Sequence, residues 1–187
     1  MSSKSSLAGW HSPPVYHLKP PRGWMNDPCA PGYDATTGTY HLFYQWNPEK
    51  CDWGNITWEH VTSRDGIHWK HNGSKPVLEP SQPYDQRGVF TGCFNPTGPG
   101  IQPGQLTVFY TSACHLPIHW SLPNTRNSEG PSMATSRDAG RTWVKSEQNP
   151  ILIGEPDDAT VTGWRDPYVA EWPALDEARE AQKGKGL

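Results

Sequence analysis

The hydrophobic positions of this chain fall into short runs that suit strands. Residues 40–46 (YHLFYQW) and 106–112 (LTVFYTS) are nearly continuous apolar runs, which is typical of strands buried on both faces. Downstream of each run, a Ser-Arg-Asp segment precedes a tryptophan. Because Asp and Gly supply turn chemistry, this pattern predicts a turn that leads into an outer strand.

These elements recur along the chain. Residues 62–69 (TSRDGIHW) return as residues 135–143 (TSRDAGRTW), one residue longer, and the Pro-Val-Leu at 76–78 returns as Pro-Ile-Leu at 150–152. A third series places an acid or amide before proline, and its members are Asp27-Pro28, Asn95-Pro96 and Asp166-Pro167. A period of about 70 residues made of short strands favours the blades of a β-propeller.

The repeat count predicts an incomplete propeller. The chain holds two full repeats and the first strand of a third, whereas a propeller needs at least four blades. We therefore expect residues 1–187 to be the N-terminal part of a longer protein, and an open β-sheet domain that happens to repeat is the alternative. The tail at residues 172–187 fits either a short amphipathic helix or a polar loop, because its Leu and Ala positions recur at helical spacing.

Composition narrows the class of protein without defining a partner. The 187 residues include 20 Pro, 18 Gly and 10 Trp, and aromatic residues at this density with a mean hydropathy of -0.77 favour an all-β fold over disorder. A net charge of -3 without a basic run gives no case for nucleic acid, and no apolar stretch is long enough to span a membrane. The first residues lack the apolar core of a signal peptide, so we expect either an intracellular protein or a secreted one whose leader is absent from this sequence. The oligomeric state is left open.

The cysteines and histidines predict neither a metal site nor a cofactor. The four cysteines, at positions 29, 51, 93 and 114, form no CxxC pair, and the histidines show no HExxH spacing. We expect unpaired structural thiols, although a disulfide framework also fits the number of cysteines.

Two aspartates are the candidates for chemistry. Asp27 and Asp166 each precede a proline, which favours extended backbone, and each follows a tryptophan and a polar residue. At equivalent places in two blades they would converge on a common axis, and two converging carboxylates are what glycosidic chemistry requires. The plainer interpretation is that each Asp-Pro is only a turn dipeptide.

Several motifs together resemble glycoside hydrolase family 32, the invertases, inulinases and fructosyltransferases. They occur in the family's order at residues 23–34, 43–48, 53–54, 89–92 and 163–169. The resemblance implies a five-bladed propeller followed by a β-sandwich, and a retaining mechanism on sucrose or fructo-oligosaccharides through a fructosyl-aspartate intermediate. The Cys-Ala-Pro-Gly after Asp27-Pro28 departs from the Asn-Gly of common invertases and resembles a fungal fructosyltransferase-like branch.

The resemblance also implies roles for individual residues. Asp27 would be the nucleophile and Asp166 the transition-state stabiliser. The matching positions for the walls of the fructose pocket are Asn26, Gln45, Trp53, Phe90, Thr91 and Arg165. Thr91 stands where the family has serine. We expect Arg165 to keep Asp166 ionised by lowering its pKa; core packing for Trp53 and a strand-end amide for Gln45 remain the alternatives.

The family's acid/base, a Glu directly followed by Cys, has no match in this chain. The residues before the four cysteines are Pro28, Lys50, Gly92 and Ala113. Neither Glu59 nor Glu171 is well placed to substitute, so we expect the acid/base beyond Leu187 and little or no activity from these residues alone. A non-catalytic carbohydrate-binding propeller and an arabinose-directed furanosidase are the alternatives. Hydrolysis and fructosyl transfer are not distinguished.

Overall fold

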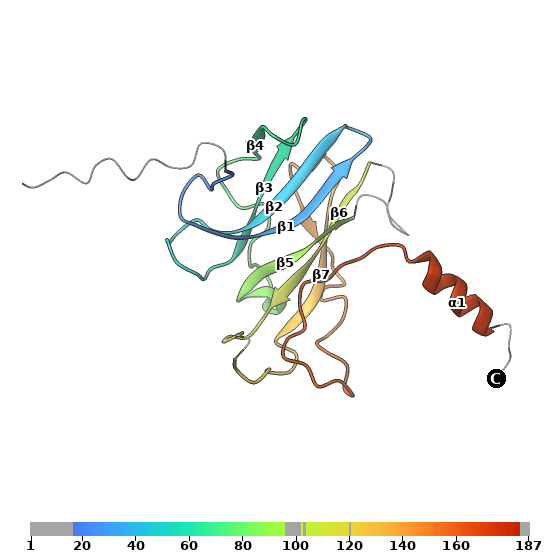
Figure 1. Ribbon diagram of the computed structural model, residues 1–187. Coiled ribbons are helices and arrows are strands. Elements are labelled where there is room, and N and C mark those ends of the chain that lie inside the picture. Colours follow the sequence, from blue (N-terminus) through green and yellow to red (C-terminus); the bar gives the residue numbers. More distant parts are fainter. Residues whose placement is uncertain (1–16, 96–101, 103, 120, 184–187) are drawn as a thin grey trace, which may run out of the picture.

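The computed structural model describes residues 17–95, 102, 104–119 and 121–183. It contains two four-stranded antiparallel sheets in which the strands follow one another in chain order (Figure 1). The first sheet comprises β1 (Trp24–Asp34), β2 (Thr39–Asn47), β3 (Thr57–Ser63) and β4 (Trp69–His71). The second comprises β5 (Gly88–Asn95), β6 (Leu106–Ala113), β7 (Glu129–Ser136) and β8 (Val144–Lys145). A short 3-10 turn, η1 (Pro83–Asp85), lies between them in sequence, and a helix, α1 (Pro173–Lys183), follows.

The two apolar runs form β2 and β6, the second strand of each sheet, as predicted. Both are buried along most of their length. The repeated turns are also confirmed: Asp65 Oδ1 accepts the backbone N–H groups of Ile67 at 2.9 Å and His68 at 2.7 Å. Asp138 Oδ1 accepts the N–H of Thr142 at 2.9 Å in the second copy. Each carboxylate thus caps the turn that leads into an outer strand.

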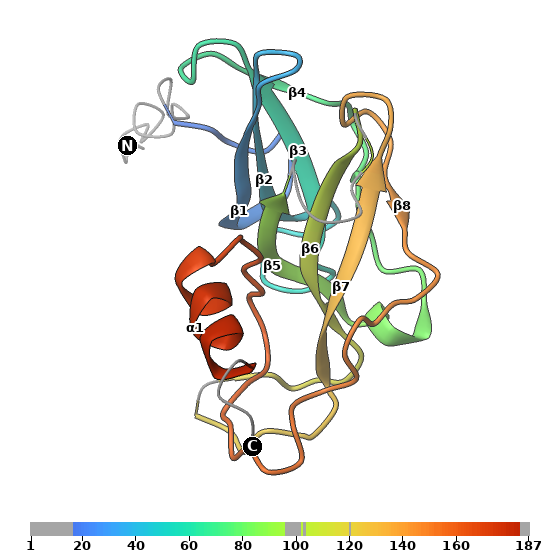
Figure 2. The same cartoon turned by 90° about the vertical axis from the view of Figure 1, so that its right-hand side faces the viewer.

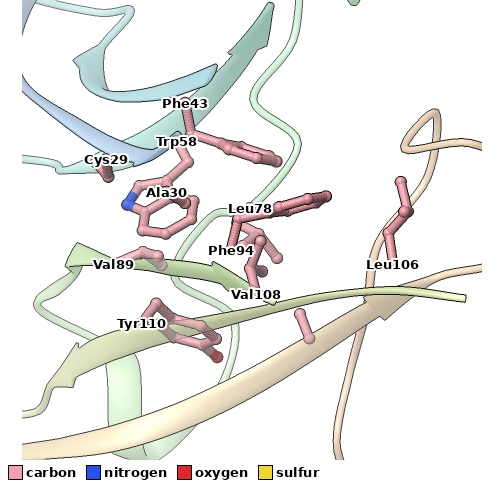
Figure 3. Close-up of a cluster of buried hydrophobic side chains, with 11 residues drawn as sticks. Cys29, Ala30, Phe43, Trp58, Leu78, Val89, Phe94, Leu106, Val108 and Tyr110 are labelled. Atoms are coloured by element: carbon pink, nitrogen blue, oxygen red, sulfur yellow. The ribbon is translucent and has the colours of Figure 1, made fainter. Parts of the chain in front are cut away.

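The two sheets pack face to face around one apolar cluster (Figure 3). Phe43 and Trp58 of the first sheet meet Val89, Val108 and Tyr110 of the second, all of them buried. The opposite face of β2 carries its own buried side chains, Tyr44 and Trp46, in a separate cluster. Burial on both faces explains why β2 has almost no polar alternation.

A stack of buried rings ties the two sheets together. His60 stacks on Phe43 with ring centroids 4.3 Å apart, and its Nδ1–H donates to the carbonyl oxygen of Gly140 at 3.0 Å. Burial lowers the pKa of His60 to about 3, so the ring stays neutral. Gly140 has φ +83°, and a Cβ there would lie 2.7 Å from His60 Cε1. Gly140 belongs to the longer copy of the repeated turn, and its carbonyl oxygen also accepts from Asn72 Nδ2 at 3.1 Å.

Glu59 is a buried carboxylate on β3 that lacks hydrogen-bond partners among the described residues. His71 Nδ1 lies 3.4 Å from its Oε1, but burial lowers the pKa of His71 and keeps that ring from supplying a charge at neutral pH. Burial raises the pKa of Glu59 from 4.5 to about 7. Ionised Glu59 therefore opposes folding.

We expect stability to fall as the pH rises through this window. Because the folded pKa is above the unfolded one, the native chain binds more protons between about pH 4.5 and 7, and ionisation costs about 3 kcal/mol above it. Glu59→Gln should flatten the dependence of the melting temperature on pH. The exposed Glu79→Gln should leave it unchanged, and parallel curves for all three proteins would contradict the assignment.

The four cysteines are unpaired, as expected: Cys29 and Cys93 are buried, Cys51 is exposed and Cys114 is partly exposed. The tail forms the helical alternative, α1, which has no buried residue. It extends away from the sheets in Figure 1, and in the turned view it faces the viewer on the side of β5 opposite β8 (Figure 2). Within the described residues, no helix has the length and apolar character needed to cross a bilayer.

Candidate functional site

Two β-bulges shape the site, one on the first strand of each sheet. In β1, Asn26 and Asp27 together lie opposite Gln45, between the pairs Met25–Trp46 and Pro28–Tyr44. In β5, the register shifts between Phe90 and Gly92, which leaves Thr91 as the extra residue. Bulges locally break the ladder and redirect side chains, and they are common beside active sites.

The bulges bring Asp27 and Thr91 together. Thr91 Oγ1 donates to Asp27 Oδ2 at 3.0 Å, and Gln45 Nε2 donates to the same oxygen at 3.4 Å. Gln45 Nε2 also donates to Thr91 Oγ1 at 3.0 Å. The other oxygen, Asp27 Oδ1, accepts no hydrogen bond from the described residues. The carboxylate of one sheet is therefore oriented by the hydroxyl of the other, and threonine keeps the hydroxyl that this contact needs.

The repeated acid-or-amide-before-proline dipeptides do not all occupy equivalent positions in the structure. In the paired strands, Cys29 lies opposite Phe43 and Cys93 opposite Phe109, so Thr91 and not Asn95 occupies the place of Asp27. Asn95 is the last residue of β5, and Pro96 lies outside the described residues. The interpretation of Asn95 as the counterpart of Asp27 is wrong, because equivalence between the sheets is set by strand pairing and not by the spacing of prolines along the chain.

Asp166 reaches the site by a different route from the expected one. Residues 161–172 form no strand, and Asp166 has φ +62°, a left-handed backbone and not the extended one that we predicted. Its N–H donates to Thr111 Oγ1 of β6 at 2.8 Å. This hydrogen bond holds Asp166 in place of strand pairing. A side-chain contact thus overrides the preference for extended backbone in a residue that precedes proline.

Arg165 does not pair with Asp166, contrary to expectation. Its guanidinium donates through Nη1 to Glu129 Oε1, and the Glu129 carboxylate is almost fully buried. The pKa of Asp166 is raised: burial is the main cause, the charges of Asp27 and Glu129 add to it, and the charge of Arg165 opposes it. The predicted net lowering is wrong because burial outweighs the charge of Arg165, whose guanidinium is paired with Glu129.

Seven of the eight sequence-predicted residues line one open cleft of about 260 Å³; they are Asn26, Asp27, Gln45, Trp53, Phe90, Arg165 and Asp166. The eighth, Thr91, acts on it through its hydrogen bond to Asp27. Trp53 is 49% exposed and meets Phe90 edge to face at 6.1 Å, so it forms a wall of the cleft and not part of the core.

Sequence reasoning missed three residues at this site. Ile118 and His119 also line the cleft, and with Trp53 they border an adjoining apolar hollow of about 620 Å³. The available signal was the run of apolar residues at 116–118 in the segment between β6 and β7. The third is Glu129, which nothing in its local sequence marks.

The cleft holds groups suited to covalent chemistry on a polyhydroxylated ligand. It combines the oriented carboxylate of Asp27, a second carboxylate with a raised pKa, an amide and an aromatic wall. Among the residues that line it, a third carboxylate is absent. Glu59 is fully buried within the first sheet, and Glu171 is exposed beyond Asp166.

Comparison with known families identifies the class. Residues 17–178 match the model of the glycosyl hydrolases family 32 N-terminal domain. The chain belongs to this family, as its motifs suggested.

Individual relatives agree with this assignment. The chain is 41% identical to beta-fructofuranosidase 1 of Zea mays over 156 residues, covering 83% of this chain and 21% of that protein. The structure resembles the Aspergillus kawachii beta-fructofuranosidase complexed with glycerol (TM-score 0.75, 34% identity, 88% of this chain, 26% of that one). It also resembles the A. japonicus fructosyltransferase (TM-score 0.73, 32% identity, 86% of this chain, 24% of that one). The chain thus spans about a quarter or less of the length of these proteins.

Proposed function

We propose that these residues are the N-terminal part of the catalytic propeller of a fructosyl hydrolase or transferase that acts on sucrose or fructo-oligosaccharides. The observation that carries the proposal is the cleft in which Asp27, oriented by Gln45 and Thr91, lies with Asp166. Membership of family 32 and the likeness to beta-fructofuranosidases support the substrate class.

In the first step, Asp27 Oδ1 attacks the anomeric carbon of the fructosyl unit. The bond from that carbon to the glycosidic oxygen breaks, and the departing oxygen takes a proton from a general acid. The hydrogen bonds from Thr91 and Gln45 to Oδ2 hold the carboxylate in the geometry for attack. Before the covalent bond forms, the negative charge of Asp27 stabilises the oxocarbenium character of the transition state.

In the second step, a water or an acceptor hydroxyl attacks the same carbon and gives its proton to the conjugate base of that acid. The bond to Asp27 breaks, so the configuration is retained and the carboxylate is restored. Asp166 binds the fructosyl hydroxyls throughout. Trp53 and Phe90 lie along the less polar face of the sugar, and the hollow beside Ile118 and His119 receives the leaving group or acceptor.

The general acid in this proposal comes from outside the 187 residues, within a five-bladed propeller followed by a β-sandwich. Without it, the leaving oxygen would depart unprotonated, and acid assistance typically contributes about 10²- to 10⁴-fold. We therefore expect the 187-residue chain to show little or no turnover by itself.

The test compares the 187-residue chain with the protein encoded by the whole gene. Both are incubated with sucrose, and glucose, fructose and oligosaccharides are separated by chromatography. The proposal expects turnover from the whole protein only, with free fructose indicating hydrolysis and fructo-oligosaccharides indicating transfer. Binding of sucrose without turnover would favour a carbohydrate-binding propeller, and turnover of arabinosides alone would favour the furanosidase alternative.

A further inference from the structure

Glu129, the first residue of β7, holds the segment that carries Asp166. Its carboxylate is almost fully buried, and each oxygen accepts one hydrogen bond from that segment. Oε2 accepts the backbone N–H of Trp164 at 2.8 Å, and Oε1 accepts Nη1 of Arg165. The two contacts fix both residues that immediately precede Asp166.

A second anchor lies directly after these contacts. The N–H of Asp166 donates to Thr111 Oγ1 at 2.8 Å, and Thr111 Oγ1 donates to the carbonyl oxygen of Thr91 at 3.0 Å. Thr91 in turn donates to Asp27. Asp166 is thus attached through Thr111 to the residue that orients the proposed nucleophile.

The backbone of Asp166 needs such support. A left-handed conformation is unfavourable for a residue with a Cβ, and it persists only where the surroundings enforce it. No strand pairing is available to residues 161–172 within the described residues. The restraint therefore comes from side chains, with Glu129 on one side of Asp166 and Thr111 on the other.

We propose that Glu129 is a positioning residue for the fructosyl chemistry, setting the place of Asp166 and keeping the Arg165 guanidinium directed away from it. The proposal rests on the function proposed above. Glu129 acts through Trp164 and Arg165 and is not among the residues that line the cleft. Its negative charge has a role beside its hydrogen bonds, because it competes with Asp166 for Arg165.

Glu129→Gln separates these roles, since the amide oxygen can accept from Trp164 while the charge is lost. In the whole protein we expect kcat to fall about 10- to 100-fold, the scale of a misplacement of about 1 Å, with a smaller change in KM. The charged or titratable groups around Asp166 are Asp27, Arg165, Glu129, the buried thiol of Cys29 and, in the lining of the same cleft, His119. Release of Arg165 toward Asp166 should move the acid limb of the pH–rate profile to lower pH.

Two further variants distinguish positioning from general destabilisation. Glu129→Asp keeps the charge on a shorter side chain, so kcat should fall while the acid limb stays in place. Asp85→Asn removes a comparable buried carboxylate, which binds Lys145 and accepts the backbone N–H groups of Ser81 and Gln82, just before η1, at 2.9 Å each. That variant should lower the melting temperature and leave KM and the pH profile unchanged.

The proposal is overturned if folded Glu129→Gln retains the kcat, KM and pH profile of the unsubstituted enzyme. If Glu129→Gln does not fold, a Glu129→Asp variant with unchanged kcat overturns it equally. A crystal structure of the Glu129→Gln variant tests positioning without a measurement of turnover. It therefore distinguishes failure of the positioning role from failure of the proposed function. Movement of Arg165 toward Asp166 supports the proposal, and unchanged positions of both residues refute it.

Discussion

Replacement of Asp27 by asparagine is expected to reduce sucrose turnover by the whole protein at least about 10⁴-fold, as for other nucleophiles in covalent catalysis. The amide still offers an oxygen to Thr91 and Gln45 but lacks a negative charge and cannot form the fructosyl ester. The measurement is initial-rate release of glucose, with fructose binding followed by calorimetry. Binding should survive while turnover is lost.

Asp157→Asn provides the matched control. Asp157 is a fully exposed acid whose ion pair with Arg126 spans 3.0 Å, and it does not line the cleft. Turnover should be unaffected by this change. An Asp27→Asn enzyme that kept its rate would remove Asp27 from the role of nucleophile.

Trp58→Ala should cost about 3–5 kcal/mol of unfolding free energy, the range for deleting a large buried aromatic side chain. Trp58 is fully buried between the sheets, 5.3 Å from Phe43 and 6.3 Å from Tyr110 by ring centroids. Its removal leaves a cavity where the sheets meet. Urea unfolding followed by circular dichroism gives the change in the midpoint.

Trp53→Ala is the comparison for this experiment, because Trp53 is 49% exposed in the cleft. It should change stability by less than about 1 kcal/mol while weakening sugar binding. Equal destabilisation by the two tryptophan substitutions would show that the apolar cluster between the sheets is not where stability resides.

Much of this architecture follows from local sequence. The runs around Phe43 and Phe109 are apolar because both faces of β2 and β6 are covered, and Asp65 and Asp138 form turns within their own segments. Such features need no knowledge of distant residues. The residues of the cleft could be predicted for another reason, because their motifs resemble those of a known family.

The features that sequence reasoning missed depend on distant contacts. The pairing of β1 with β2 and of β5 with β6 decides that Thr91, and not Asn95, matches Asp27, and this register cannot be counted from proline spacing. The left-handed backbone of Asp166 is supported by Thr111, 55 residues earlier. The raised pKa of Asp166 comes mainly from its burial in the folded chain, and the pairing of Arg165 with Glu129, 36 residues earlier, is equally invisible in the local sequence.

The hydrogen bond between Asp27 and Thr91 has a consequence for how such repeats can be exchanged during evolution. Each sheet looks like an interchangeable unit, but the proposed nucleophile belongs to one and its hydroxyl donor to the other. Recombination between the two units separates residues that must fit together to within a fraction of an ångström. We therefore expect parents with matching strand sequences but different bulges to yield chimeras that fold with a displaced carboxylate, so that exchange of the two repeats together preserves the site and exchange of one does not.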